Sequence, residues 1–217
     1  AEHAIMMMLA TGRRLAFCDS ELREGRWHSN TFRSSARQLF GSTVGIIGFG
    51  RIGKQVAKRL IGIATSTIYT DLLEMSPEIE VELKAKHVDI DTLLAKSDFV
   101  SLHVPLTELT HHLIDEVAIN KMKAGVTLIN CARGPVVLEV ALIAALKSGH
   151  IGGAGLDVFE VEPPAAPNPF ADFANVVLTP HHAPGTRDTM IVKFKEIFAN
   201  ADRFFNGERM QNEISLI

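Results

Sequence analysis

Three short stretches in the second half of the 217-residue sequence carry side chains that could share one active site. They are N-C-A-R-G-P-V-V (130–137), G-L-D-V-F-E-V-E-P-P (155–164) and T-P-H-H-A (179–183). Arg133 offers a guanidinium, which can hold a carboxylate through two parallel hydrogen bonds. His181, backed by the carboxylate of Glu162, could exchange a proton near neutral pH. These residue types predict a site that binds the carboxylate of a ligand and transfers a proton to or from that ligand.

A glycine-rich loop, G-F-G-R-I-G (48–53), lies upstream of these stretches. Glycine clusters alone are weak signals, but this one follows a short β-branched run (43–47) and opens a helical pattern, the context that a dinucleotide-binding loop requires. The glycines would permit a tight turn, close approach of the pyrophosphate and close helix packing, and the helix start would offer amide donors. The residues expected to contact the cofactor here are Gly48, Gly50, Arg51, Ile52 and Gly53.

Asp71 follows Gly48 by 23 residues, at the end of the second predicted strand. A carboxylate there can accept hydrogen bonds from both ribose hydroxyls and would repel a 2′-phosphate. No arginine occurs in the next six residues, L-L-E-M-S-P, so the sequence favours NAD over NADP. A bound nicotinamide can give or take a hydride. The sequence therefore predicts interconversion of a 2-keto acid and a 2-hydroxy acid.

Apolar strand-like runs alternate with helical patterns along the middle of the chain. We expect strands at 43–47, 67–70, 87–90, 98–104, 126–130, 153–157 and 175–179, and helices at 52–60, 91–96, 115–122 and 138–147. This alternation predicts an α/β fold, a doubly wound parallel sheet of the Rossmann type. Two apolar or amphipathic helices, at 1–16 and 187–206, do not belong to the sheet and are expected to pack on material outside it.

Composition excludes several classes of function. The net charge of −3 gives no electrostatic footprint for nucleic acid or an anionic membrane. Cys18 and Cys131 have neither metal-site nor disulfide spacing, which suits a cytoplasmic protein. The apolar run 4–10 is too short to span a bilayer. We expect no metal site: the pair His111–His112 lacks ligand spacing and is interpreted as structural.

Five motifs, in order, carry a resemblance to a known family. They are the three stretches above, G-S-T-V-G-I-I-G-F-G-R-I-G and S-D-F-V-S-L-H-V-P-L-T. The chain resembles the D-isomer-specific 2-hydroxyacid dehydrogenases over nearly all its length. The resemblance implies that Arg133 binds the substrate carboxylate, that His181 is the acid/base and that Glu162 orients it. It also implies cofactor contacts, and together with His103 at a predicted strand end the expected set is His103, Val104, Pro105, Cys131, Ala132, Asp157 and Ala183.

The resemblance also bears on organisation. It implies an NAD-binding domain at 1–186, including the first flanking helix, and a C-terminal helix of a substrate-binding domain at 187–217. Members normally carry most of that second domain before the point where this sequence begins. We therefore expect a homodimer that turns over 2-keto acids poorly on its own. Leu138, where the family usually has aspartate, and Pro184 depart from its pattern without removing a chemical group.

Several alternatives remain open at this level. His182 competes with His181 as the acid/base, and Glu162 could be a solvated loop residue like its neighbour Glu160. Cys131 could be a reactive thiol, although a small residue beside the cofactor is the simpler account. At the level of function, the chain could be an NAD-binding fragment without activity, or a redox-sensing protein resembling a corepressor.

Overall fold

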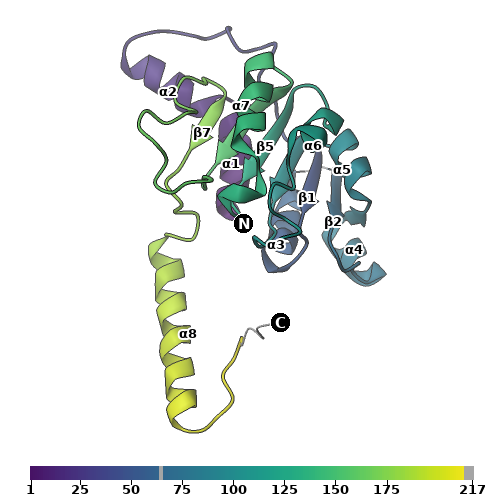
Figure 1. Ribbon diagram of the computed structural model, residues 1–217, viewed down its shortest axis with the longest axis vertical. Helices are drawn as coiled ribbons and strands as arrows, with labels where there is room; N and C mark the ends of the chain where they lie inside the picture. Colours follow the sequence, from purple (N-terminus) through teal and green to yellow (C-terminus); the bar gives the residue numbers. More distant parts are fainter. Residues whose placement is uncertain (64–65, 213–217) are drawn as a thin grey trace. The chain divides into compact units, whose positions relative to one another are not determined.

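The computed structural model describes residues 1–63 and 66–212 (Figure 1). The chain divides into two compact units, one up to His181 and one from His182 onward. The strands are β1 (Thr43–Ile47), β2 (Ser66–Thr70), β3 (Ala85–His87), β4 (Phe99–Leu102), β5 (Val126–Asn130), β6 (Ile151–Leu156) and β7 (Val176–Leu178). The helices are α1 (Glu2–Gly12), α2 (Leu15–Arg23), α3 (Arg51–Leu60), α4 (Pro77–Leu83), α5 (Ile90–Lys96), α6 (Glu116–Lys121), α7 (Glu139–Ser148) and α8 (Arg187–Phe205), with 3-10 turns η1 (Ile61–Ile63) and η2 (Gly134–Val136).

All seven strands pair in parallel in the order β3-β2-β1-β4-β5-β6-β7, so the predicted doubly wound sheet is confirmed. The chain order reverses between β1 and β4, which makes that point the topological switch. Ligands bind at the carboxyl ends of the strands in such open sheets.

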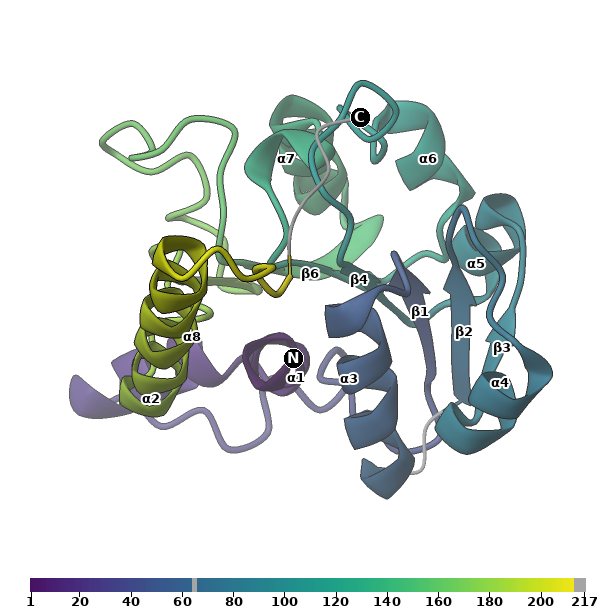
Figure 2. The ribbon, with the colours of Figure 1, turned by 90° about the horizontal axis from the view of Figure 1, so that it is seen from below.

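Helices cover both faces of the sheet. Figure 2 shows α1 and α3 on one face and α5, α6 and α7 on the other, and α4 packs beside α3. Each face has its own apolar core. One includes the buried Met7 and Met8 of α1 with Val56 of α3, and the other includes Leu142 of α7 and Ile119 of α6. Because strands buried on both faces must be apolar throughout, the near-continuous apolar runs in the sequence are explained.

Two expected elements need correction, and one helix was missed. The helix predicted at 1–16 ends at Gly12, and a second helix, α2, begins at Leu15, because Arg14 adopts a left-handed conformation with φ of 53°. The third strand is Ala85–His87 rather than 87–90, since the side chain of Asp89 accepts a hydrogen bond from the Thr92 amide and starts α5 early. Helix α4, with proline in its first turn, was not predicted.

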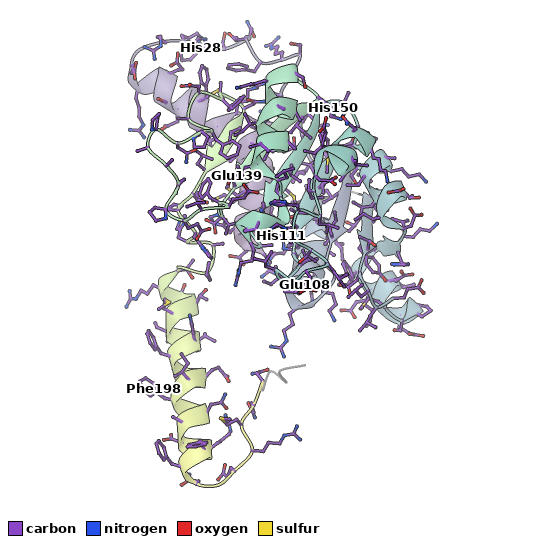
Figure 3. The ribbon with its side chains drawn as sticks, in the orientation of Figure 1. His28, Glu108, His111, Glu139, His150 and Phe198 are labelled. Atoms are coloured by element: carbon purple, nitrogen blue, oxygen red, sulfur yellow. The ribbon has the colours of Figure 1, made fainter. Side chains whose placement is uncertain are left out.

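The second unit contains α8, whose N-cap Thr186 accepts a hydrogen bond from the Thr189 amide. No residue of α8 is buried, although the helix carries many apolar side chains, including Phe198, which projects from it in Figure 3. The helix predicted at 187–206 is thus confirmed, while residues 213–217 of the proposed C-terminal segment lie outside the described residues. Within the described residues, every helix is too short or too polar to cross a membrane.

Candidate active site

One row of paired residues crosses the carboxyl edge of the sheet. The row runs through Thr70, Ile47, Leu102, Asn130, Leu156 and Leu178, each paired with the next. The residues one step beyond it are Asp71, Gly48, His103, Cys131, Asp157 and Thr179. Five of these six are residues predicted to contact the cofactor. Strand register therefore brings the predicted cofactor residues to one edge of the sheet.

The glycine-rich loop occupies the start of this row beside the switch point. Gly48 has φ of 92°, and a Cβ there would lie 2.7 Å from the carbonyl carbon and oxygen of His103, so the turn requires glycine. Gly50 has no atom within 4 Å of the position of a Cβ, which leaves open space at the start of α3. No side chain caps that helix start. An anion fits such a site because the first-turn amide donors of a helix have no intrahelical partners.

Asp71 is held in place by backbone amides. Its Oδ2 accepts the Phe49 N–H at 2.5 Å, and its Oδ1 accepts the Leu73 N–H at 3.2 Å. Phe49 is itself fixed by stacking on the buried ring of Tyr69 at 3.9 Å between centroids. A carboxylate offers about four lone-pair positions, so Asp71 keeps capacity for ribose hydroxyls. The loop and the carboxylate together fit a dinucleotide.

His181 and Glu162 form a direct pair, 2.7 Å between Nδ1 and Oε2. The other carboxylate oxygen, Oε1, accepts the Phe159 N–H at 3.0 Å. The backbone of His181 is also fixed: its φ is 50°, and its N–H donates to the carbonyls of Asp157 and Thr179. Since Nδ1 faces Glu162, Nε2 is the ring nitrogen that remains to exchange a proton with a ligand.

The carboxyl of Glu162 is stabilised in its charged form. Partial burial raises its pKa, but the hydrogen bonds from His181 and from the Phe159 N–H more than offset this effect. The pKa of Glu162 therefore lies below its ordinary value. An ionised Glu162 can accept a hydrogen bond from a proton-bearing Nδ1, which fixes the orientation of the His181 ring. Glu162 is an exposed loop residue, but both of its carboxylate oxygens have hydrogen-bond partners.

Arg133 follows β5 in a short loop organised by Asn130. The side chain of Asn130 accepts the Ala132 N–H and donates to the Arg133 carbonyl, both at 3.0 Å. The guanidinium is exposed and donates to the Ala132 carbonyl at 2.6 Å. Across residues 1–63 and 66–212, no carboxylate forms an ion pair with it. Since arginine has five N–H donors, Arg133 keeps enough of them to grip a carboxylate.

Gly134 joins the loop of Arg133 to the turn that carries Glu162. A Cβ at Gly134 would overlap the carbonyl group of Phe159 and the amide nitrogen of Glu160. All of these are backbone atoms, so only glycine permits the contact. The sequence contained this signal in the Arg-Gly-Pro motif, but the partner of the glycine could not be read from it.

Asp157 is fully buried, and sequence reasoning missed its partner His3. The Thr179 hydroxyl donates to Asp157 Oδ1 at 2.6 Å, and His3 Nε2 lies 3.0 Å from that hydroxyl and 3.4 Å from Oδ1. A buried polar side chain is tolerated when it has hydrogen-bond partners such as these. Helix α1 therefore contributes a polar side chain to the same edge of the sheet. A lone histidine in an apolar helix pattern was the only available signal.

The other residues predicted to contact the cofactor differ in burial, and two of them, Cys131 and His103, have strongly shifted pKa values. Burial raises the pKa of the Cys131 thiol to about 12, so the thiol stays protonated near neutral pH and the reactive-thiol alternative loses support. Burial lowers the pKa of His103 to about 3, so its ring is neutral, and its Nε2 lies 2.9 Å from the Ser101 hydroxyl. Ala132 is buried beside them, while Val104 is half-buried and Pro105 exposed.

The structure also places Glu160, the His111–His112 pair, His182 and Ala183. His112 Nε2 contacts Glu160 Oε1 at 2.7 Å, so Glu160 is a half-buried, paired residue rather than a solvated one. The rings of His111 and His112 contact each other in a tilted arrangement, with 3.9 Å between their centroids. His182 and Ala183 belong to the second unit and are exposed and half-buried.

Comparisons with known proteins agree with the fold and the cofactor. A sequence model described as "D-isomer specific 2-hydroxyacid dehydrogenase, NAD binding domain" matches residues 5–183. A glyoxylate reductase from Korarchaeum cryptofilum is 40% identical over 217 residues, which cover 99% of this chain and 65% of the relative. A D-3-phosphoglycerate dehydrogenase from Archaeoglobus fulgidus is 43% identical over 216 residues, 100% of this chain and 40% of the relative. The chain thus spans less than two thirds of either relative.

A solved structure shows the same arrangement. The D-lactate dehydrogenase from Aquifex aeolicus, crystallised with NAD and lactic acid, matches with a TM-score of 0.85 at 33% identity, over 95% of this chain and 66% of that one. The α/β fold and the NAD cofactor predicted from the sequence are confirmed. The chain belongs to the D-isomer specific 2-hydroxyacid dehydrogenases and carries their NAD-binding domain.

Proposed function

We propose that the protein interconverts a 2-keto acid and a D-2-hydroxy acid with NAD(H). The observation that carries the proposal is the 2.7 Å pair between His181 and Glu162. It is joined through the Gly134 contact to a loop that presents Arg133, an arginine without an ion-pair partner among the described residues. An anion anchor and a proton donor at one sheet edge, together with an NAD site, suit this reaction. The family assignment and the reductases and dehydrogenases among its relatives support it.

The residues divide the work by charge. Arg133 would hold the carboxylate of the keto acid through two N–H donors. His181, as the imidazolium, would donate the Nε2 proton to the carbonyl oxygen as negative charge develops there. Glu162 would hold the ring through Nδ1, so that Nε2 faces the substrate. Bound NADH supplies the hydride that reduces the carbonyl carbon. In the oxidation direction, neutral His181 would take the hydroxyl proton at the same nitrogen.

The organisation of the whole protein is part of the proposal. We assign 1–186 to the NAD-binding domain and 187–217 to a substrate-binding domain, because α8 buries none of its apolar side chains. We also propose a homodimer in which α1 takes part. Met6 and Leu9 of α1 are each 44% exposed, although the opposite side of that helix is buried against the sheet.

Substitutions in the intact protein test the roles. His181→Gln should lower kcat by on the order of 10²–10⁴ with little change in NADH affinity, and the adjacent His182→Gln is the matched control. Arg133→Lys and Arg133→Ala should both raise KM for a panel of 2-keto acids, since lysine cannot make the bidentate contact. If His181→Gln kept more than half the activity while His182→Gln lost it, the acid/base assignment would pass to His182.

A further inference from the structure

The turn that carries Glu162 makes a second set of polar contacts, separate from the pair between Glu162 and His181. The Glu160 N–H donates to Glu139 Oε1 at 2.8 Å, and the Glu160 side chain contacts His112 Nε2 at 2.7 Å. In the same turn, the Phe159 N–H donates to Glu162. One hydrogen bond therefore joins residues 159 and 162 within the turn, and two others tie residue 160 to residues outside it.

The partners of Glu160 come from two other segments. Glu139 is the first residue of α7 and is labelled in Figure 3. His112 lies between β4 and α6 in a left-handed conformation with φ of 51°, and its N–H donates to the Pro135 carbonyl at 2.8 Å. Pro135 directly follows Gly134, which packs on the turn. The segments of Arg133, Glu162 and His112 are thus cross-linked by contacts that avoid Arg133, Glu162 and His181 themselves.

Charge explains why these contacts are made as a set. Glu139 and Glu160 are both half-buried carboxylates. Burial raises the pKa of Glu139, and the nearby charge of Glu160 raises it further. The hydrogen bond from the Glu160 N–H acts in the opposite direction and lowers that pKa. His112 offers Glu160 a donor that reduces the repulsion between the two carboxylates. Side chains for which only bulk mattered would not need this matching of donors and acceptors.

We propose that Glu160, His112 and Glu139 are positioning residues that hold the 159–162 turn so that Glu162 meets Nδ1 of His181. This inference rests on the proposed function, because it names what aligns its acid/base pair. The three residues act through Glu162 and do not touch the reacting atoms. Their loss would leave Glu162 in the chain but free to turn away, and His181 would then lose the partner that selects its Nδ1–H form.

Nitrogen NMR of the 217-residue chain tests the proposal without any turnover. With Glu162 in place, neutral His181 should carry its proton on Nδ1. Glu160→Ala should shift the ratio of the two ring tautomers by about tenfold toward Nε2–H, because a hydrogen bond to a charged group is worth roughly that factor. It should also reduce the hydrogen-exchange protection of the Phe159 amide. Glu160→Gln, which keeps an acceptor for His112, should restore both signals. Val161→Ala, in the same turn but exposed, is the matched control.

A double-substitution cycle separates positioning from general destabilisation. If Glu160 and His112 act as one contact, the pair Glu160→Ala with His112→Ala should change the tautomer ratio no more than either alone. His112→Ala tests the same contact should Glu160→Ala fail to fold. An unchanged His181 tautomer in both folded single variants, or equal effects from Val161→Ala, would overturn the proposal. If the variants shift the tautomer ratio as expected but the intact protein turns over no 2-keto acid, only the proposed function is refuted.

Discussion

Replacing Gly134 with alanine tests whether the anchor loop and the acid/base turn form one unit. The added methyl group would overlap the Phe159 carbonyl and the Glu160 amide nitrogen. Backbone atoms cannot rotate aside as the end of a flexible side chain can, so one of the two segments must move. Arg133 precedes the substitution and Glu162 follows the obstructed backbone, so the movement separates the two groups.

The size of the effect follows from two opposing contributions. Forcing a methyl group into a closed contact typically costs about 1–3 kcal/mol. Replacing glycine by alanine returns about 0.4–1 kcal/mol by restricting the unfolded chain. We expect Gly134→Ala to lower the free energy of unfolding by a net ~1–2 kcal/mol. A misplacement of roughly 1 Å costs on the order of 10²-fold in rate, so activity in the intact protein should fall further than stability alone would require.

Urea unfolding followed by circular dichroism measures the stability change, with Gly62→Ala as the control. Gly62 has no atom within 4 Å of the position of a Cβ, so alanine there should be neutral or slightly stabilising. Unfolding midpoints that coincide for Gly134→Ala and Gly62→Ala would refute the reasoning. So would a Gly134→Ala enzyme with unchanged kcat and KM, because the close backbone contact would then have no role in aligning the site.

Three further outcomes follow from the site. NADH should bind at least tenfold more tightly than NADPH, a difference of about 1.4 kcal/mol, and Asp71→Ala should narrow the gap in fluorescence titrations; equal affinities in the unmodified chain would contradict this. Because the pKa of Glu162 is lowered from 4.5, the stability that its charge contributes is complete above that pH and is lost as pH falls through the lower folded value. The difference in unfolding free energy between the unmodified chain and Glu162→Gln should shrink as pH falls below about 4.5, and a difference that stays constant from there down to pH 2 would count against the pair. Since burial raises the pKa of Cys131 to about 12, iodoacetamide at pH 8 should modify Cys131 only after unfolding, and mass spectrometry showing rates equal to those of Cys18 would argue otherwise.

The sheet could be predicted from sequence because its information is local. Strands at 43–47 and 126–130 match the structure residue for residue, since short β-branched runs between turn residues have few other readings. Once the strand ends are known, parallel pairing places the following residues on one edge. Asp71 therefore falls into position without knowledge of a single side-chain contact, whereas the predicted strand 153–157 ran one residue too far and the role of Asp157 came from the family resemblance.

Contacts between distant segments could not be predicted in this way. His3 meets Asp157 across 154 positions of sequence, and His112 meets Glu160 across 48. Nothing in a periodic pattern identifies such partners, because a polar side chain on a loop looks the same whether it is solvated or paired. The division of the N-terminal helix at Arg14 was missed for a related reason, since a left-handed arginine has no local sequence signal.

The two hydrogen bonds of the Asn130 side chain have a consequence for the thermodynamics of ligand binding. That side chain closes the loop onto Ala132 and Arg133, and the carbonyl of Asp157 holds the amide of His181. The backbone at these positions is ordered by the protein itself. Loops that order only on ligand capture lose conformational entropy at that moment, whereas a preorganised site avoids this cost. Calorimetry of NADH binding should accordingly lack the large entropic penalty that accompanies the folding of a loop.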